Sequence, residues 1–261
     1  MPMDLLNHPE IAAVMFHPRA EYGQVHEDIR TRTVRFKLPE GVVIGGRLHS
    51  AAVDAPIVLL FHGNGEIASD YDDLAPVYRQ LGLSLLVADY RGYGISSGQP
   101  SADTLIGDAL AVWREAPAVV AAAGLEPSRW LLMGRSLGSA AALAVAAEST
   151  DGPKLSGLII ESGFAETLAL ISRLGGSLPP GAVEARDGFD SLGRIAKVTA
   201  PTLIIHGEED WIIPFKDGRK LFDASGAADK RLLPIRGAGH NDLMMVGARE
   251  YFPAIAELAK R

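Results

Sequence analysis

Five short runs of almost continuously apolar residues constrain the fold more than any other feature of the chain. They cover residues 57–61, 84–88, 130–133, 157–160 and 202–205, and longer segments of helical character separate them. Strands this apolar are buried on both faces, as in a parallel sheet that helices cover. The alternation therefore predicts an α/β fold with a doubly wound, mostly parallel sheet, helices on both faces and right-handed crossovers.

Weaker patterns complete the predicted sheet. Residues 33–38 alternate between polar and apolar, and residues 42–48 return after the turn sequence Pro39-Glu40-Gly41. This arrangement indicates an antiparallel hairpin near the N-terminus. Residues 231–235 form the last predicted strand, and Pro234 confines that strand to a sheet edge or a strand end.

Five segments between the strands have the composition of helices. They cover residues 70–81, 101–123, 137–148, 215–223 and 241–260. Pro117 and Pro253 lie inside two of them, and a proline both removes a helical hydrogen bond and clashes with the preceding turn. We therefore expect a kink or a break at each proline.

The chain length favours a single domain that covers residues 1–261. Of these residues 48% are hydrophobic, which is enough for a substantial core. Residues 1–30 precede the predicted sheet as an N-terminal extension. Residues 163–197 lack a clear pattern and connect two buried strands, so we interpret them as a short lid-like excursion and expect a minimal lid.

Composition excludes several classes of function. A net charge of −7 without a basic cluster argues against nucleic acid as a partner. The chain has no cysteine, which excludes disulfides, thiolate metal sites and a cysteine nucleophile, and no metal site is expected. No apolar run reaches the roughly 20 residues of a membrane span, and the N-terminus does not resemble a signal peptide. We therefore expect a cytoplasmic protein without integral membrane association; the sequence leaves its oligomeric state open.

One serine lies in a pattern that is typical of a nucleophile. Gly134-Arg135-Ser136-Leu137-Gly138 matches the nucleophile elbow, a sharp turn that holds a reactive serine between a strand and a helix. A second match around Ser96 is followed by Gly98-Gln99-Pro100, which is typical of a loop. An apolar strand precedes Ser136 and an alanine-rich helix follows it. This context selects Ser136 as the nucleophile and Ser96 as a loop residue.

A serine hydroxyl needs a base that removes its proton during attack, and in folds of this kind the base comes late in the chain. His240 fits because it follows the last predicted strand, within Gly239-His240-Asn241-Asp242. His62 and His206 directly follow apolar strands and are expected near the site. The other histidines precede the parallel sheet and are expected at the surface: His8, His17, His26 and His49.

The acid that orients this histidine should follow the last strand but one. Glu208, Glu209 and Asp210 are the candidates. We expect Asp210, because Gly207 permits a turn that brings its carboxylate to the histidine; Glu209 is the main alternative. An acid in this role holds the imidazole tautomer and stabilises the imidazolium, so it should be buried.

The oxyanion of an acyl-transfer reaction needs two backbone N–H donors. We expect Leu137 to supply one, since it follows the nucleophile at the start of a helix whose dipole attracts negative charge. We expect Asn64 to supply the other, from the turn His62-Gly63-Asn64-Gly65 at the end of the first buried strand.

These motifs, in this order, resemble those of the α/β-hydrolase superfamily from about residue 31 to the C-terminus, and the resemblance includes residues 89–96. The sequence is most similar to the small, lid-poor group that includes the BEM46-like and ABHD17-like hydrolases. The resemblance implies a cofactor-free esterase or thioesterase mechanism and supports Asp210 over its glutamate neighbours. It also makes Ser96 part of a structural loop in which Asp89 and Arg91 fix the strand end. The cysteines of membrane-associated relatives are missing, which argues against membrane-bound lipid substrates.

The reaction expected from the motifs is hydrolysis of a small-molecule ester or thioester through an acyl-enzyme intermediate. A peptidase or amidase of the same fold, and a non-catalytic binding protein, are the alternatives. Apolar residues near the predicted site indicate a pocket for an acyl chain or an aromatic ester. We expect its walls at Ile67, Phe164, Leu168, Trp211, Ile212 and Met244, together with Ile171, Leu174 and Leu178.

Overall fold

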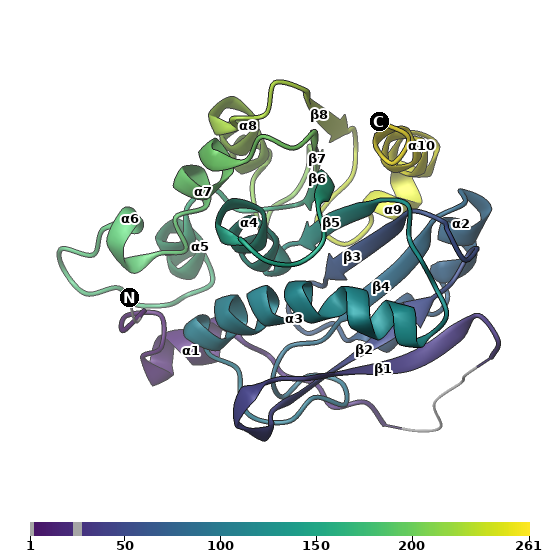
Figure 1. The fold of residues 1–261 in the computed structure, drawn as a ribbon. Coiled ribbons are helices and arrows are strands. Elements are labelled where there is room, and N and C mark those ends of the chain that lie inside the picture. The colour runs from purple at the N-terminus through teal and green to yellow at the C-terminus, as the bar shows by residue number, and fades with distance from the viewer. Residues whose placement is uncertain (1–2, 23–27) are drawn as a thin grey trace.

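An eight-stranded sheet lies at the centre of the fold, with the strand order β1-β2-β4-β3-β5-β6-β7-β8 (Figure 1). The computed structural model describes residues 3–22 and 28–261. The strands are β1 (Thr31–Lys37), β2 (Val43–His49), β3 (Ile57–Phe61), β4 (Ser84–Ala88), β5 (Trp130–Arg135), β6 (Leu155–Glu161), β7 (Thr202–Gly207) and β8 (Lys230–Ile235). β1, β2 and β4 pair antiparallel, whereas the strands from β4 across to β8 pair in parallel. The predicted mostly parallel sheet with its N-terminal antiparallel hairpin is confirmed, and the strand that contains Pro234 lies at an edge.

Helices cover both faces of this sheet. They are α1 (Pro9–Met15), α2 (Ala75–Gln80), α3 (Ala102–Ala122), α4 (Gly138–Glu148), α5 (Thr167–Arg173), α6 (Glu184–Asp187), α7 (Ser191–Lys197), α8 (Phe215–Ala224), α9 (Leu243–Val246) and α10 (Ala248–Leu258). Side chains of α3, α4, α7 and α8 join one apolar cluster, and those of α2, α9 and α10 join a second cluster on the opposite face. The predicted doubly wound arrangement is therefore confirmed.

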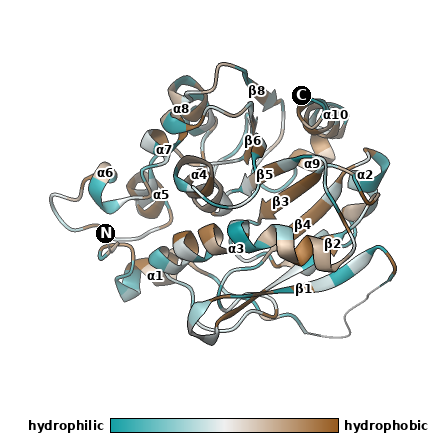
Figure 2. Ribbon diagram, viewed as in Figure 1, coloured by the Kyte–Doolittle hydropathy of each residue, from teal (hydrophilic) through white to brown (hydrophobic). Residues whose placement is uncertain are grey.

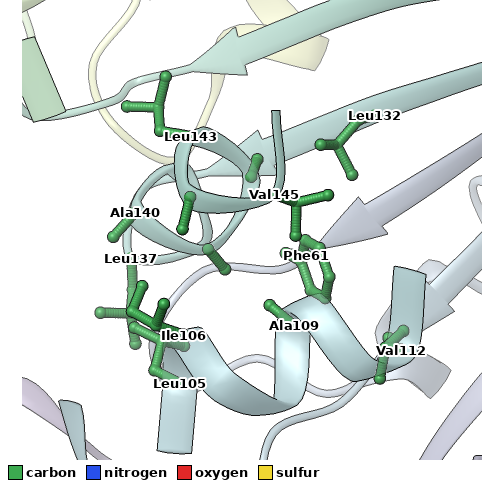
Figure 3. Close-up of a cluster of buried hydrophobic side chains, with 14 of the residues drawn as sticks. Phe61, Leu105, Ile106, Ala109, Val112, Leu132, Leu137, Ala140, Leu143 and Val145 are labelled. Atoms are coloured by element: carbon green, nitrogen blue, oxygen red, sulfur yellow. The ribbon is translucent and has the colours of Figure 1, made fainter. Parts of the chain in front are cut away.

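The central strands are apolar because both of their faces are buried. Successive side chains of a strand point to opposite faces. In β3, Phe61 belongs to the cluster under α3 and α4, whereas Val58 and Leu60 belong to the cluster under α2 and α10. Figure 2 shows β3 as hydrophobic almost throughout, and Figure 3 shows Phe61 and Leu132 in one cluster with Ala109 of α3.

The prediction of a break at each of two prolines, and that of one helix over residues 241–260, need correction. α3 and α10 each continue through their prolines, Pro117 and Pro253, without a break. In α3, burial of Trp113 and Val120 on either side of the proline outweighs the one lost hydrogen bond. The segment expected at 241–260 is instead divided before α10, at Gly247, where a Cβ would lie 2.6 Å from the Ile235 side chain.

The lid-like excursion and the N-terminal extension contain more structure than their sequences indicate. Residues 163–197 carry the three short helices α5, α6 and α7, of seven, four and seven residues. The N-terminal extension carries α1, which packs against α5. Helices this short show little of the periodicity on which prediction depends. Among residues 3–22 and 28–261, no helix has the length and apolar character needed to cross a bilayer.

His49 corrects the expectation of a surface histidine. Its side chain is fully buried at the end of β2, with Nδ1 3.2 Å from Thr31 Oγ1 and Nε2 3.5 Å from Asp72 Oδ1. Burial, together with the positive charges of Arg79 and Arg47, lowers the pKa of His49 from 6.5 to about 4. The predicted surface position of His26 lies outside the described residues.

We expect His49 to make the protein less stable in mild acid. Below pH 6.5 the unfolded chain binds a proton at this residue, whereas the folded chain does not until the pH approaches about 4. The free energy of unfolding should therefore fall through this window, and His49 should account for about 2 kcal/mol of the loss between about pH 7 and about pH 5. Urea unfolding at the two pH values checks this, since His49→Gln should lose less stability on acidification than the wild type.

The matched control for this experiment is His8→Gln, which removes an exposed histidine. It should show the wild-type pH dependence. An equal loss of stability in the wild type and in His49→Gln would contradict the prediction.

Candidate active site

The strand order places two predicted site segments at the same point of the sheet. The chain passes from β3 outward to β4 and then returns across β3 to β5, so the order reverses between β3 and β5. Open α/β sheets form a crevice beyond the carboxyl ends of the strands at such a point. His62 directly follows β3 and Ser136 directly follows β5, and the two strands are paired neighbours.

Ser136 lies in a strained turn between β5 and α4. Its φ angle is 51°, in the left-handed region that a residue with a side chain rarely adopts. A Cβ on Gly134 would lie 2.7 Å from the Cβ of Ala142, and one on Gly138 would collide with the carbonyl oxygen of Phe61. The two glycines of the motif therefore permit the close approach of strand and helix that raises the serine above the sheet.

Ser136, His240 and Asp210 form a continuous chain of hydrogen bonds. The distance from His240 Nε2 to Ser136 Oγ is 2.9 Å, and that from His240 Nδ1 to Asp210 Oδ2 is 2.7 Å. The second oxygen of Asp210 accepts the backbone N–H groups of Ile212 and Ile213 at 2.9 and 2.8 Å. The structure thus brings together the three side chains that the sequence selects. This arrangement can transfer a proton from the serine to the imidazole while a carboxylate stabilises the resulting cation.

Asp210 is the one buried carboxylate of its loop, since Glu208 and Glu209 are exposed. Burial by itself would raise the pKa of Asp210. The hydrogen bond and charge of His240 and the N–H of Ile213 outweigh burial, so the pKa of Asp210 lies below its usual value. The carboxylate is therefore ionised at neutral pH.

Two further histidines lie beneath the site and support its loops. His206 is fully buried, its Nε2 donates to the carbonyl of Ile213 at 2.7 Å, and burial lowers its pKa. His62 is also fully buried and donates from Nδ1 to the carbonyl of Gly63 at 2.8 Å. Both lie near the site, as expected from their positions after apolar strands, but neither lines the cavity.

A cavity of about 250 Å³ opens beside Ser136. Its apolar wall consists of Met15, Leu137, Phe164, Leu170, Ile171, Leu174, Ile212 and Ile213. Its polar wall consists of His17, Asn64, Glu66, Arg135, Thr167 and Asn241, beside Ser136 and His240. The cavity therefore has an apolar side for a hydrocarbon group and a polar side next to the hydrogen-bonded chain.

Only some of the wall residues expected from the sequence line this cavity. Phe164 and Ile212 do, as do Ile171 and Leu174, whereas the remaining five do not: Ile67, Leu168, Leu178, Trp211 and Met244. Ile67 and Leu168 are buried in the core, Leu178 packs against the core, and Met244 packs on the opposite face of the sheet. Trp211 is 81% exposed. Position in the chain placed these residues near the site, but the direction of each side chain decides whether it reaches the cavity.

The N-terminal extension supplies cavity residues that the sequence analysis missed. Met15 and His17 line the cavity, and the backbone N–H of His17 donates to Asn64 Oδ1 at 2.9 Å. The Asn64 side-chain amide lies 2.8 Å from His17 Nδ1, and the hydroxyl of Tyr93 donates to Asn64 Oδ1 at 2.7 Å. The spacing of Ile11 and Met15, four residues apart, is a signal of an amphipathic helix here, and both side chains are buried.

The backbone N–H groups of Asn64 and Leu137 have no acceptor among the described residues. Both residues line the cavity. Leu137 also directly precedes α4, so its N–H lies at the positive end of that helix. In the part of the chain that the structure describes, no cluster of histidine and carboxylate side chains could hold a metal ion.

A family model described as "Serine aminopeptidase, S33" matches residues 54–175 and 182–244, which is more than half of the chain. The chain belongs to this family of α/β-hydrolases. Among curated proteins, alpha/beta hydrolase domain-containing protein 17C of Xenopus tropicalis is 33% identical to this hydrolase over 247 residues, 90% of this chain and 73% of that protein. An uncharacterized protein of Mycobacterium tuberculosis is 33% identical over 228 residues, 86% of this chain and 77% of that protein.

Solved structures show the same fold. The hydrolase superposes on the esterase Pf2001 of Pyrococcus furiosus with a TM-score of 0.75 and 17% identity, over 94% of this chain and 98% of that one. It superposes on a soluble variant of monoglyceride lipase from Saccharomyces cerevisiae, solved with a substrate analogue, with a TM-score of 0.67 and 18% identity, over 87% and 94% of the two chains. The α/β-hydrolase fold that the sequence motifs implied is therefore confirmed.

We expect Gly138→Ala to disrupt the elbow. The new Cβ would collide with the Phe61 carbonyl and lie 2.8 Å from that of His62, and neither backbone can move without shifting β3. The protein should lose about 3 kcal/mol or more in free energy of unfolding. Urea unfolding of the purified variant measures this loss.

Gly107→Ala is the matched control, because Gly107 lies inside α3 and, apart from the backbone of that helix, no atom lies within 4 Å of an added Cβ. This substitution should leave stability unchanged or raise it by about 0.5–1 kcal/mol. Equal stability of the two variants would show that the elbow does not need a glycine at position 138.

Proposed function

We propose that this hydrolase cleaves carboxylic ester or thioester bonds through an acyl-enzyme intermediate. Ser136 is the nucleophile, His240 the general base and Asp210 the acid that orients it. One observation carries the proposal, namely the unbroken hydrogen-bonded chain of these three side chains at the edge of a largely apolar cavity.

In the first half of the reaction, Ser136 Oγ attacks the substrate carbonyl while its proton passes to His240 Nε2. The tetrahedral intermediate collapses when His240 returns that proton to the leaving alkoxide or thiolate. In the second half, His240 removes a proton from water, which attacks the acyl-enzyme and releases the acid and Ser136. Asp210 remains ionised throughout and stabilises the imidazolium at each step.

The oxyanion binds to the N–H groups of Leu137 and Asn64. Both groups belong to cavity residues and neither donates within the described residues. The side chain of Asn64 is held by His17 and Tyr93, which fixes the turn that carries its N–H. Donors that are fixed before the reaction stabilise developing charge without a cost of reorganisation.

The walls of the cavity favour an acyl chain over a polar substituent. Eight of the lining side chains are apolar, and most come from the β6–β7 connection and the loop after β7. Burial of a methylene group contributes about 0.8 kcal/mol, so each buried methylene of an acyl chain strengthens binding. Two solved proteins of the same fold, an esterase and a monoglyceride lipase, support ester substrates.

The name of the matching family raises an aminopeptidase as the alternative. Such an enzyme needs a carboxylate that binds the free ammonium group of a peptide. Glu66 is the acidic side chain among the described cavity residues, and it is paired with Arg135. Both oxygens of Glu66 already accept hydrogen bonds, one from Arg135 and the other from Gly63 and Tyr71, which disfavours binding of a peptide amine and favours the ester reaction. Turnover of aminoacyl amides but not of esters would reverse this preference.

We expect Ser136→Ala to lower turnover of p-nitrophenyl esters by about 10³-fold or more, because only binding and oxyanion stabilisation remain. Labelling by a fluorophosphonate probe should disappear as well, since this probe reacts with an activated serine. Esters and thioesters of graded acyl length should be assayed in parallel to define the preferred chain.

Ser96→Ala is the matched control, because Ser96 lies in the second sequence match and its hydroxyl accepts the N–H of Gly45 at 2.8 Å. It should keep wild-type turnover and labelling. Undiminished hydrolysis by purified Ser136→Ala would refute the assignment of the nucleophile.

Asp210→Asn should lower kcat by about 10³–10⁴-fold, since an amide can impose the wrong imidazole tautomer and cannot stabilise the cation. Glu209→Gln, which neutralises the exposed neighbouring carboxylate, should stay within about twofold of the wild type because exposed charges contribute little. Steady-state kinetics on one ester compare the two variants. A larger loss in Glu209→Gln than in Asp210→Asn would transfer the role of the acid to Glu209.

A further inference from the structure

A buried cation directly precedes the proposed nucleophile, and the reaction described above does not use it. Arg135 is 6% exposed and occupies the position between Gly134 and Ser136 at the end of β5. Burial of a guanidinium is costly unless charges and hydrogen bonds compensate it. The contacts of Arg135 therefore have to account for its presence.

Arg135 connects the nucleophile strand to the loop that carries the proposed base. Its Nη2 donates to the main-chain carbonyl of His240 at 3.1 Å and to Asn241 Oδ1 at 3.1 Å. Asp210 orients the imidazole of His240, but it does not hold the main chain of that residue. Arg135 makes this second attachment across 105 positions of the sequence.

Two carboxylates hold the guanidinium in place. Arg135 Nε donates to Glu161 Oε1 at 3.1 Å, and Nη1 pairs with Glu66 Oε1. Glu161, at the end of β6, is 1% exposed and also accepts the hydroxyl of Tyr251 at 2.6 Å. Burial would lower the pKa of Arg135, but the charges of Glu161 and Glu66 outweigh it and keep the pKa above its usual value.

Glu66 extends the connection to the proposed oxyanion loop. Its Oε2 accepts the backbone N–H of Gly63 at 2.8 Å and the hydroxyl of Tyr71 at 2.8 Å. A Cβ on Gly63 would lie 2.5 Å from Arg135 Nη1, so the loop packs directly on the ion pair. Arg135 and Glu66 together contact the nucleophile strand, the base loop and the oxyanion loop.

We propose that Arg135 is a positioning residue that fixes the His240 main chain and, through Glu66, the 62–65 loop relative to Ser136. The proposal rests on the proposed function of this site. Arg135 and Ser136 are adjacent in the backbone. The Arg135 side chain therefore connects the nucleophile strand directly to the main chain of His240. A misplacement of about 1 Å between reacting groups can cost about 100-fold in rate, which makes this attachment important for catalysis.

The test compares two substitutions that each remove a buried guanidinium. Arg135→Met removes the attachment, whereas Arg194→Met removes an ion pair to Glu148 at the C-terminal end of α4, far from Ser136. On one ester, Arg135→Met should lower kcat by about 10- to 100-fold and leave KM within about threefold. Arg194→Met should keep both constants near the wild type. A purely structural role for Arg135 would lower the amount of folded protein and leave the kcat of the folded fraction unchanged.

Arg135→Lys serves as the conservative variant. A lysine ammonium can satisfy a carboxylate but cannot reproduce the planar fork that reaches the acceptors at Glu161 and His240 together. It should restore the amount of folded protein more fully than kcat. Recovery of the full wild-type kcat in Arg135→Lys would overturn the proposal, since charge alone would then be sufficient.

If Arg135→Met does not fold, Glu66→Gln provides the test instead. This variant should fold, because the side chain of Glu66 is 25% exposed and the substitution keeps its size. It should lower kcat by about 5- to 20-fold with little change in KM. Wild-type kcat in folded Arg135→Met, or in Glu66→Gln when Arg135→Met is unfolded, would overturn the positioning role. The fluorophosphonate probe distinguishes this result from failure of the proposed function. A labelled wild type with unchanged kcat in the variants would overturn the positioning role alone, whereas an unlabelled wild type would overturn both.

Discussion

The sharp turn between β5 and α4 is the constraint on which the rest of the site depends. It holds Ser136 at a φ angle of 51°, a conformation that persists only when the surrounding structure imposes it. Burial of α4 against the sheet imposes it here, because Gly138 packs directly on the backbone of Phe61 and the helix is fully buried for most of its length. The packing that defines the fold is therefore the same packing that exposes the serine.

Two attachments of different kind fix the histidine relative to that serine. Asp210 bonds the imidazole, and its own second oxygen is held by the N–H groups of the following turn. Arg135 bonds the main chain, and its charge is balanced by carboxylates from the loop after β3 and from the end of β6. Orientation of the ring and location of its backbone are separate requirements for the proposed proton transfer, and a different buried charge contacts each of the two.

Sequence patterns predicted the sheet and selected the three side chains that the structure joins in one hydrogen-bonded chain, because each of these predictions rests on local signals. Continuous apolar runs indicate doubly buried strands, and the strand and helix around Ser136 distinguish it from Ser96. The cavity wall could not be predicted in this way, since Ile212 lines the cavity while its neighbour Trp211 is exposed. The contact between His17 and Asn64 joins residues 47 positions apart that no local pattern connects. Burial of His49 likewise follows from the pairing of β2 within the sheet and not from its neighbours in sequence.

The cavity wall combines segments from widely separated parts of the chain. Met15 is the last residue of α1 in the N-terminal extension. Leu170 belongs to α5, and Leu174 directly follows that helix. Because α1 packs against α5, two short helices from separate parts of the chain border the apolar side together. The same N-terminal segment bonds Asn64 through His17, so the part of the chain that borders the cavity also holds the proposed oxyanion turn.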